Sequence, residues 1–418
     1  MADNVVHIPA RRRTRVMVVV GTRAQAIACA PVVRALREGA ARFHAIVVGA
    51  GLHRDRFVPT LHDLDMECDI DLSLPGDIDE GQFHLLAGNA VLRFGLVVSR
   101  LRPDIVLVQG ASATALAVAL TAFHNNVPVA HIDTGPHDAP EGRTGIPPAE
   151  EGNRRCIAAV ASLHFAATVA ARDALLHEGV DGARIAVTGA TVAESLRRFA
   201  ETGQAEGPAP DGEGKGSVTV RAAAPPVPAR PWPEGRTVLV SLNGMHASPP
   251  ALKNVCAAVR ELALARRDTG FLVPVGSHRP LRDAAIPLLG AVPNVRLMPV
   301  PPLPEFVACL RAACLVLTDA ADVLEQAAAL GVPVLALRAT PHLPEAVRAG
   351  RARLVGTDKA AILRETAALL DDPAHRAAMA AACAAPGDGH ASERITLALD
   401  RFMTGLAPLL PPHAEFRA

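Results

Sequence analysis

Short apolar runs alternate with amphipathic stretches along most of the chain. In the first half these runs are rich in Val and Ile, end at a polar turn and lead into residues with helical spacing, as buried parallel strands and their crossover helices do. The expected strands are residues 16–20, 45–49, 104–108, 127–132 and 185–188, and the expected helices are 24–38, 54–64, 81–101, 112–125, 150–161 and 169–178. This alternation predicts an α/β domain built around a doubly wound parallel sheet.

Residues 202–235 interrupt the pattern, because Gly, Pro, Glu and Ala dominate them. A stretch of this composition buries too little apolar surface to offset the entropy of ordering, so we predict an interdomain linker. A second alternating set follows. Its expected strands are residues 237–242, 271–275, 295–298, 314–318 and 333–337, and its expected helices are 251–266, 280–289, 304–312, 322–330, 344–349, 359–371 and 373–384.

The chain is therefore expected to form two Rossmann-like domains. We predict an N-terminal domain over 1–201, the linker over 202–235, a C-terminal domain over 236–388 and a final segment over 389–418. A turn around Gly387 precedes the last expected helix, about 390–406, which is predicted to pack back toward the N-terminal domain. Two such domains predict a ligand cleft between the facing ends of their strands.

Composition narrows the class of partner. The chain has 418 residues, half of them hydrophobic, which is enough for two separate cores. Lys and Arg together number 42, as do Asp and Glu, so no net charge favours nucleic acid or an anionic membrane surface. Tyr is absent and Trp232 is the single tryptophan, which leaves few platforms for stacking bases. We expect a small-molecule ligand and, without a leader-like segment, a cytoplasmic protein.

The cysteines and histidines do not form a metal-binding pattern. The seven cysteines contain no Cys-x-x-Cys pair and lie mostly in apolar, Ala-rich surroundings, which predicts buried thiols rather than disulfides or zinc ligands. The sixteen histidines include no His-x-x-x-His or His-Glu-x-x-His spacing, so neither a structural nor a catalytic metal is expected.

In the first half, polar residues follow the expected strands at three places. Gly21 and Arg23 follow the first strand, where backbone N–H groups and a guanidinium could face a diphosphate, although such turns also occur without a ligand. Gln109 ends another strand. Asp133 ends a third strand and is predicted to bring a carboxylate to the mouth of the sheet, where ligands of open α/β sheets bind.

A helix beginning near Glu150 supplies a second acid. Glu150 and Arg154 are four residues apart on one helix face, and two carboxylates with an arginine in a cleft suit acid–base chemistry at a sugar carbon. The alternative is structural. A helix N-terminal charge that favours the dipole, together with a surface i,i+4 ion pair, would explain the same residues.

The second half also places polar loops after its expected strands. Asn243 and His246 follow the first strand, His278 follows the next, and Asp322 lies just beyond the strand at 314–318. Loops on the carboxyl side of strands are candidate ligand contacts. Glu325 lies on the following helix, where it could hold a ribose, and a solvated helix face explains it equally well.

Several ordered motifs resemble the UDP-N-acetylglucosamine 2-epimerase family of the non-hydrolysing bacterial type. The segment 21–31 is similar to the family's opening Gly-Thr-Arg-Pro-Glu-Ala-Ile…Ala-Pro. The similarity extends through residues 149–154, 188–192, 330–335, 344–346, 354–358 and 387–395, and so covers nearly the whole chain outside the linker.

The resemblance implies a GT-B-like fold of two Rossmann-type domains, usually a homodimer, with the nucleotide held mainly by the second domain. The family inverts C2 of the sugar by removing its proton and expelling UDP from C1, and then reverses both steps without an external cofactor. By position, Arg23 and Arg154 would bind phosphate or orient the acids. Asp133 and Glu150 would be the acid–base groups, and Glu325 falls beside the family's ribose-holding acid.

The sequence departs from the family at several of these positions. Ala111 replaces an expected catalytic carboxylate, Ala28 replaces a lysine, and Asp133 replaces a glutamate. Residues 243–246 replace the family's His-Arg-Arg-Glu loop. Asp322 stands where glycines let the backbone approach the diphosphate, and two like charges 4 Å apart repel by about 4 kcal/mol at an effective dielectric of 20.

Three functions follow from this pattern. The first is a diverged enzyme acting on a nucleotide sugar or related phosphorylated metabolite of a specialised pathway, with Asp133, Glu150 and His246 in acid–base roles. The second is a bona fide epimerase with compensating substitutions, and the third is a binding or regulatory homologue without turnover. We favour the first, because Arg23, Glu150 and Arg154 persist together.

Overall fold

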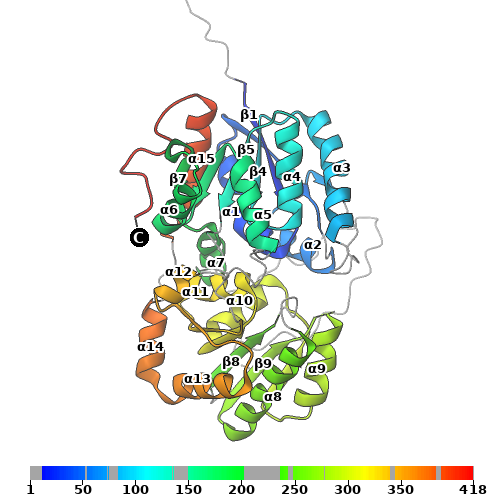
Figure 1. Cartoon of the computed structure of the whole chain (residues 1–418), viewed down its shortest axis with the longest axis vertical. Coiled ribbons are helices and arrows are strands. Elements are labelled where there is room, and N and C mark those ends of the chain that lie inside the picture. Colours follow the sequence, from blue (N-terminus) through cyan, green and yellow to red (C-terminus); the bar gives the residue numbers. More distant parts are fainter. Residues whose placement is uncertain are drawn as a thin grey trace, which may run out of the picture. The chain divides into compact units, whose positions relative to one another are not determined.

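A computed structural model gives the fold of the chain as two compact units. Unit 1 comprises Met1–Gly135, Ala149–Thr191 and Gly389–Ala418, and unit 2 comprises Pro136–Pro148 and Val192–Asp388 (Figure 1). The structure describes residues 12–51, 54–72, 74, 83–133, 135, 149–201, 236–242, 248–276, 278–338, 344–382 and 387–417. The predicted linker, 202–235, lies outside these ranges.

Unit 1 is built on a seven-stranded parallel sheet in the order β3-β2-β1-β4-β5-β6-β7. Its strands are β1 (Thr14–Val20), β2 (Phe43–Gly49), β3 (Ile70–Asp71), β4 (Ile105–Gln109), β5 (Val129–Asp133), β6 (Leu163–Ala166) and β7 (Ile185–Val187). Strands on both sides of β1 follow it in the chain, so the predicted doubly wound α/β fold is confirmed.

Helices cover this sheet in two layers. The helices of unit 1 are α1 (Arg23–Glu38), α2 (Arg54–Asp63), α3 (Phe83–Leu101), α4 (Ala113–His124), α5 (Ala149–Val160), α6 (Val169–His177) and α15 (Ala391–Met403). On one face α4 packs between α3 and α5, and Phe94 and Ile157 meet Met17 and Val106 of the sheet in one buried cluster. Helix α1 packs against α2 and α15 (Figure 1).

The C-terminal segment is part of unit 1. The Arg394 guanidinium donates to the carbonyl of Thr188, and the Phe416 N–H donates to the carbonyl of Val187 at the end of β7. These bonds satisfy backbone groups at the edge strand, where the ladder has no further partner.

Unit 2 has a six-stranded parallel sheet in the order β10-β9-β8-β11-β12-β13. The strands are β8 (Arg236–Ser241), β9 (Thr269–Pro274), β10 (Val295–Met298), β11 (Leu315–Thr318), β12 (Val334–Ala336) and β13 (Ala352–Leu354). The helices are α7 (Thr191–Glu201), α8 (Pro249–Ala265), α9 (Arg279–Leu289), α10 (Leu303–Ala312), α11 (Ala321–Ala329), α12 (Pro344–Arg348), α13 (Lys359–Asp371) and α14 (Pro373–Ala382).

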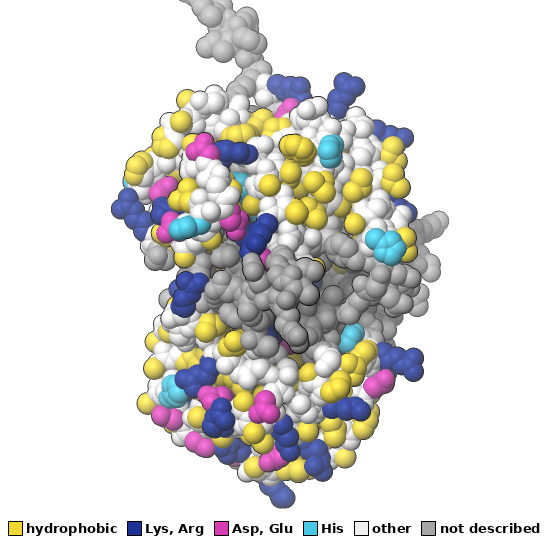
Figure 2. Space-filling model, viewed as in Figure 1, with side chains coloured by type: hydrophobic (Ala, Val, Ile, Leu, Met, Phe, Trp, Pro, Cys, Tyr) yellow, Lys and Arg dark blue, Asp and Glu magenta, His cyan; other side chains and the backbone are white. Residues whose placement is uncertain are grey.

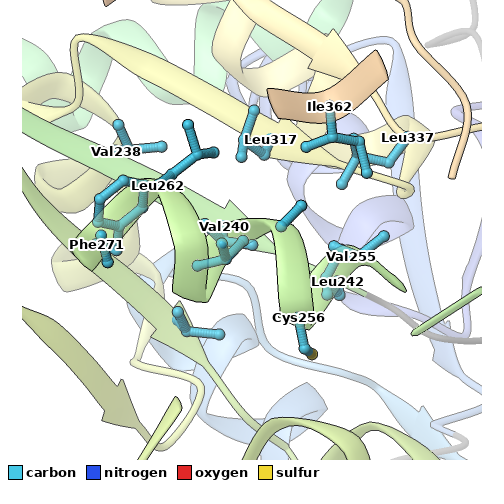
Figure 3. Packing of buried hydrophobic residues seen from close by; sticks show 14 of the residues in the cluster. Val238, Val240, Leu242, Val255, Cys256, Leu262, Phe271, Leu317, Leu337 and Ile362 are labelled. Carbon is cyan, nitrogen blue, oxygen red and sulfur yellow. The ribbon is translucent and has the colours of Figure 1, made fainter. Parts of the chain in front are cut away.

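Alternating residues of this second sheet point to its two faces and pack into two hydrophobic cores. Val238 and Val240 of β8 pack with Phe271, Leu317 and Ile362 in one cluster (Figure 3). The residues between them face the other side, where they pack with α10 and α11. A parallel sheet buried on both faces needs continuous apolar strands, which is why these strands are readable as uninterrupted hydrophobic runs.

The structure adds elements that the sequence pattern did not predict, namely β3, β6, β13 and α7. The three strands have two, four and three residues, and runs this short give only a weak periodic signal. Strand β6 also carries His164 among its apolar residues. The last helix ends at Met403 rather than near 406, because Gly405 adopts φ 69° just beyond it.

Thiol burial follows the sequence expectation for half of the described cysteines, and Cys68 and Cys314 are partly buried. Cys29, Cys256 and Cys309 are buried, and burial raises the pKa of Cys29 to about 12. Cys156 is an exception and is exposed, while Cys383 lies outside the described residues. No helix among the described residues is long and apolar enough to cross a membrane.

Candidate functional site

The first candidate site lies at the carboxyl ends of β1, β4 and β5 in unit 1. The sheet order reverses direction between β1 and β4, and ligands of open α/β sheets bind at such a switch point. Gly21 follows β1, Gln109 ends β4 and Asp133 ends β5. The structure therefore places these three predicted residues at one edge of one sheet.

A glutamine joins the ends of β1 and β4. The buried side chain of Gln25 accepts the Gly21 N–H at 2.8 Å and donates to the carbonyl of Gln109 at 2.9 Å and to Ser112 Oγ at 3.1 Å. A Cβ on Gly21 would lie 3.3 Å from Gln25 Oε1, so the glycine permits this close approach. Gln25 was not among the predicted site residues.

Arg23 lies at the start of α1, directly after this junction. Thr22 caps the helix by accepting the Gln25 N–H at 3.2 Å, and the Arg23 side chain is half-buried. The helix N-terminus and a guanidinium thus occupy neighbouring positions, which is a favourable arrangement for an anion. Phosphate binding by Arg23 remains a prediction.

The loop after β4 is held from two directions. Gly110 adopts φ 69° and its carbonyl accepts a hydrogen bond from His131 Nε2 at 3.0 Å. The carbonyl of Ala111 accepts a bond from Asn153 Nδ2 of α5 at 3.0 Å. The loop is therefore fixed by β5 and α5 although the acidic side chain expected at Ala111 is missing.

Asp133 has a fully buried carboxylate with two unequal oxygens. Oδ1 accepts the Gly135 N–H at 3.0 Å. Oδ2 makes no hydrogen bond and lies 3.7 Å from Arg154 Nη1. A buried carboxylate oxygen without a hydrogen bond calls for an explanation, and a catalytic role is one that would account for it.

Arg154 is a fully buried cation held by two glutamates. Its Nε and Nη2 donate to the two oxygens of Glu151 at 2.9 and 3.0 Å, and its Nη1 donates to Glu178 Oε2 at 3.1 Å. Nη2 also donates to Glu178 Oε1. Burial opposes the charge of Arg154, but the bonds to Glu151 and Glu178 and the charge of Asp133 outweigh it and raise the pKa.

This geometry corrects one sequence-based alternative. Arg154 has no exposed side-chain surface, so a surface i,i+4 ion pair with Glu150 does not describe it. The i,i+4 pair on this helix joins Glu151 to Arg155 instead, at 2.6 Å. Glu150 is half-buried in the first turn of α5. Of the two roles expected for Arg154, orientation of the acids is the one its buried position suits.

Two histidines lie side by side in the adjacent strands β5 and β6. The rings of His131 and His164 are both buried, with centroids 6.2 Å apart. Burial lowers the pKa of His164 to about 3, and His131 and Arg184 add to the effect. Burial also lowers the pKa of His131, against the opposing influence of Asp133 and the Gly110 carbonyl. Both rings are therefore neutral at pH 7.

The second candidate site lies at the carboxyl end of β11 in unit 2, beside the switch point between β8 and β11. Thr318 Oγ1 accepts the Ala320 N–H at 3.0 Å, and α11 begins without a side-chain cap. Asp322 is half-buried in the first turn of that helix, where the helix dipole favours a negative charge.

Glu325 and His278 are the other described candidates in unit 2. Burial, with the charge of Asp322, raises the pKa of the half-buried Glu325 to about 7. His278 caps α9 by accepting the Leu281 N–H on Nδ1 at 3.4 Å. Asn243 and His246 lie outside the described residues, so their expected roles are not addressed by the structure.

A family model described as UDP-N-acetylglucosamine 2-epimerase matches residues 34–400. The chain belongs to the UDP-N-acetylglucosamine 2-epimerase family. It is 35% identical over 391 residues to a probable UDP-N-acetylglucosamine 2-epimerase of Ralstonia nicotianae, covering 93% of this chain and 99% of the relative. It is 33% identical over 391 residues to the UDP-N-acetylglucosamine 2-epimerase of Escherichia coli K12, covering 92% and 98%.

Solved structures agree with this membership of the UDP-N-acetylglucosamine 2-epimerase family. A putative member from Listeria monocytogenes aligns with a TM-score of 0.82 at 29% identity, covering 95% of this chain and 98% of that one. The Neisseria meningitidis enzyme bound to UDP-GlcNAc aligns with a TM-score of 0.81 at 28% identity, covering 92% and 99%. The resemblance inferred from the motifs and the GT-B-like fold class of two Rossmann-type domains are thereby confirmed.

The epimerase family consists of isomerases, and the relatives carry that activity in their names. Sequence reasoning found Asp133, Glu150 and Arg154 within the family's motifs but missed Gln25, Glu151 and Glu178. Glu151 lies three residues before Arg154, a spacing at which side chains on a helix meet. Glu178 lies 24 residues beyond Arg154, and no periodicity indicates that contact.

Proposed function

We propose that this protein is an isomerase that moves a proton at C2 of a nucleotide sugar, with Asp133 and Glu150 as the acid–base pair. Both residues belong to unit 1, one at the end of β5 and one in the first turn of α5. The named activity of relatives that are 33 to 35% identical over more than nine-tenths of the chain supports the reaction class.

The observation that carries the proposal is the state of the Asp133 carboxylate. Its Oδ2 is buried and unbonded, while Oδ1 is fixed by the Gly135 N–H and Arg154 keeps a positive charge 3.7 Å away. A desolvated oxygen with no hydrogen-bond donor retains its lone pairs for a substrate proton. The nearby guanidinium of Arg154 places a positive charge beside the carboxylate without donating a hydrogen bond to this oxygen.

The turn before α11 suggests that the substrate differs from UDP-N-acetylglucosamine. Ala320 and Ala321 replace a serine and a glycine of the family loop, and Asp322 adds a carboxylate. A carboxylate in the first turn of α11 interacts with the same helix N-terminus that would stabilise a phosphate. We propose a nucleotide sugar or related phosphorylated metabolite of a specialised pathway that places less negative charge there.

The test is proton exchange at C2. The purified protein is incubated in heavy water with UDP-N-acetylglucosamine and a panel of other nucleotide sugars and sugar phosphates, and deuterium at C2 is followed by NMR. Exchange with another sugar, and little with UDP-N-acetylglucosamine, is expected. Exchange with UDP-N-acetylglucosamine as the best substrate would identify a bona fide epimerase, and ligand binding without any exchange would identify a binding homologue.

Two variants test the residue roles. Asp133→Asn and Glu150→Gln are each expected to slow exchange by about 10²- to 10⁴-fold, the usual contribution of a general acid or base. The matched substitution Glu365→Gln, in unit 2, removes a glutamate paired with Arg353 and Arg364 and should leave the rate unchanged. Full exchange in Glu150→Gln would show that Glu150 is not an acid–base residue.

We also propose that the protein is a cytoplasmic homodimer, as the resemblance implies. Hydrophobic side chains gather over α3 and α4 on one face of unit 1 (Figure 2). On α3, Leu92 and Leu96 are 71% and 64% exposed, and Phe123 of α4 is 51% exposed. A second copy of this chain is the occupant we propose for this face, because exposed leucines spaced four apart form an apolar stripe that the same stripe of a second copy can cover.

A further inference from the structure

We propose that Glu178 is a positioning residue that keeps Asp133 Oδ2 free of a hydrogen bond by holding Arg154 away from it. The inference rests on the proposed function and concerns how the chain prepares its own acid–base group. Glu178 follows the last residue of α6 and lies far from Asp133 in the sequence, and no family motif quoted above contains it.

Arg154 donates four hydrogen bonds to the two glutamates. A guanidinium has five N–H groups. Nε and one N–H of Nη2 bind Glu151, while Nη1 and Nη2 each bind an oxygen of Glu178. One N–H of Nη1 remains on the side of Asp133, but the 3.7 Å separation is too long for a hydrogen bond.

Glu151 and Glu178 hold the guanidinium from two different elements. Glu151 is on α5 itself and is also bound by Arg155 at 2.6 Å, so its carboxylate is fixed by two arginines. Glu178 comes from the end of α6 and binds the same Nη1 atom that faces Asp133. Glu178 is therefore the carboxylate that competes with Asp133 for Nη1.

The burial of these side chains indicates which carboxylate Arg154 Nη1 would bind if the charge of Glu178 were removed. Asp133, Arg154 and Glu151 are at most 3% exposed, whereas the Glu178 side chain is 28% exposed. An interaction with a buried cation is strong because little water screens it. Without the Glu178 charge, Nη1 is expected to turn to the nearest remaining carboxylate oxygen, which is Asp133 Oδ2.

The chemical consequence concerns the basicity of Asp133. A charge-assisted hydrogen bond from Arg154 would stabilise the ionised carboxylate and occupy the lone pair needed for the substrate proton. Holding Arg154 at 3.7 Å supplies a nearby positive charge without that bond. Glu178 would in this way leave Asp133 Oδ2 beside a positive charge and still able to accept a proton.

The kinetic test uses Glu178→Gln, which keeps the shape of the side chain but removes its charge. We expect kcat to fall by about 10- to 100-fold on the best substrate of the panel, as misplacement of a catalytic group does, with KM within about threefold. The acid limb of the pH dependence of kcat should move to lower pH. Glu178→Asp, which retains the competing charge, should recover most of the activity.

Glu365→Gln is the matched control, because Glu365 is likewise a partly buried glutamate in ion pairs with arginine, and its side chain is 20% exposed. A loss of thermal stability in Glu178→Gln with kcat and its pH profile unchanged would overturn the proposal, since a purely structural ion pair would behave in that way. Equal losses in Glu178→Asp and Glu178→Gln would also contradict it.

A crystal structure of Glu178→Gln separates this inference from the proposed function. If the unmodified protein exchanges no sugar proton, the proposed function fails, but the Nη1–Oδ2 distance still tests the positioning role. Shortening from 3.7 Å to hydrogen-bond distance, about 3 Å, supports it. An unchanged distance overturns it, whatever the activity.

Discussion

The amide group of Gln25 both accepts and donates hydrogen bonds, so a carboxylate cannot replace it in full. Oε1 accepts the Gly21 N–H, whereas Nε2 donates to the Gln109 carbonyl and to Ser112. The family's opening motif has a glutamate at this position. A carboxylate can accept from Gly21, but it cannot donate to a carbonyl oxygen.

We therefore predict that Gln25→Glu destabilises the protein although it restores the family residue. The buried Gln109 carbonyl would lose its donor and face a negative charge, at a cost of about 1–3 kcal/mol or more. Urea unfolding followed by circular dichroism measures the effect, and Gln25→Met serves as the uncharged comparison. Equal or greater stability of Gln25→Glu would show that the junction tolerates an acceptor.

His164 gives a second prediction at the residue scale, concerning pH. Its pKa is about 3 in the folded chain, against 6.5 for an ordinary histidine. As the pH falls, the unfolded chain therefore binds a proton at this residue before the folded chain does. The contribution of neutral His164 to the free energy of unfolding is fully present above about pH 6.5. It falls as pH drops from 6.5 toward 3, by up to about 1.4 kcal/mol per pH unit.

Replacing this histidine should flatten the acid side of the stability profile. In His164→Phe the loss of unfolding free energy between pH 7 and pH 5 is expected to be smaller by about 2 kcal/mol. Denaturant titrations at both pH values measure it, with exposed His44 of β2 replaced by Phe as the control. An unchanged profile would contradict the role of His164 burial.

At the scale of elements, the first turn of α11 contains a carboxylate of the chain itself, that of Asp322. The helix has no side-chain cap, and Asp322 lies in its first turn, where a carboxylate interacts favourably with the dipole. A ligand phosphate at the same terminus would meet this charge.

We predict that Asp322→Gly increases the affinity for UDP by about fivefold, since removing a partly solvated like charge is worth about 1 kcal/mol. Isothermal titration with UDP measures the change. Glu305→Gly alters a half-buried acid in the first turn of α10 and is the control. If both variants bind UDP as the unmodified protein does, Asp322 does not determine the charge of the ligand.

At the scale of the whole molecule, the stripe on α3 predicts self-association. Exposed large apolar side chains that are contiguous usually mark an interface, and Leu92 and Leu96 are neighbours on one helix face. A homodimer through this stripe would leave the carboxyl ends of the strands of unit 1 accessible, because α3 lies on a face of the sheet.

We predict that charged substitutions in this stripe dissociate the dimer. Leu92→Glu combined with Leu96→Glu should convert a dimer into a monomer in size-exclusion chromatography with light scattering, because buried unpaired carboxylates are costly. Leu264→Glu changes an exposed leucine of α8 and should have no effect. A dimer that survives the double substitution would place the interface elsewhere.

The sequence alone determined the alternation of strands and helices, the two parallel sheets and the family, because these depend on local periodicity and on motifs of adjacent residues. It also placed Asp133 at the end of a strand and Glu150 and Arg154 on a helix. Three short strands, β3, β6 and β13, were not predicted, since two to four residues give little periodic signal.

Only the tertiary structure decided which polar groups meet. Gln25 binds a carbonyl 84 residues away, and Glu178 reaches Arg154 across 24 residues. These contacts join separately packed elements, so no spacing in the chain encodes them. The environment of Asp133, with one oxygen bonded and one left free, follows from how β5, α5 and α6 pack together, and neighbouring residues in the sequence carry no sign of it.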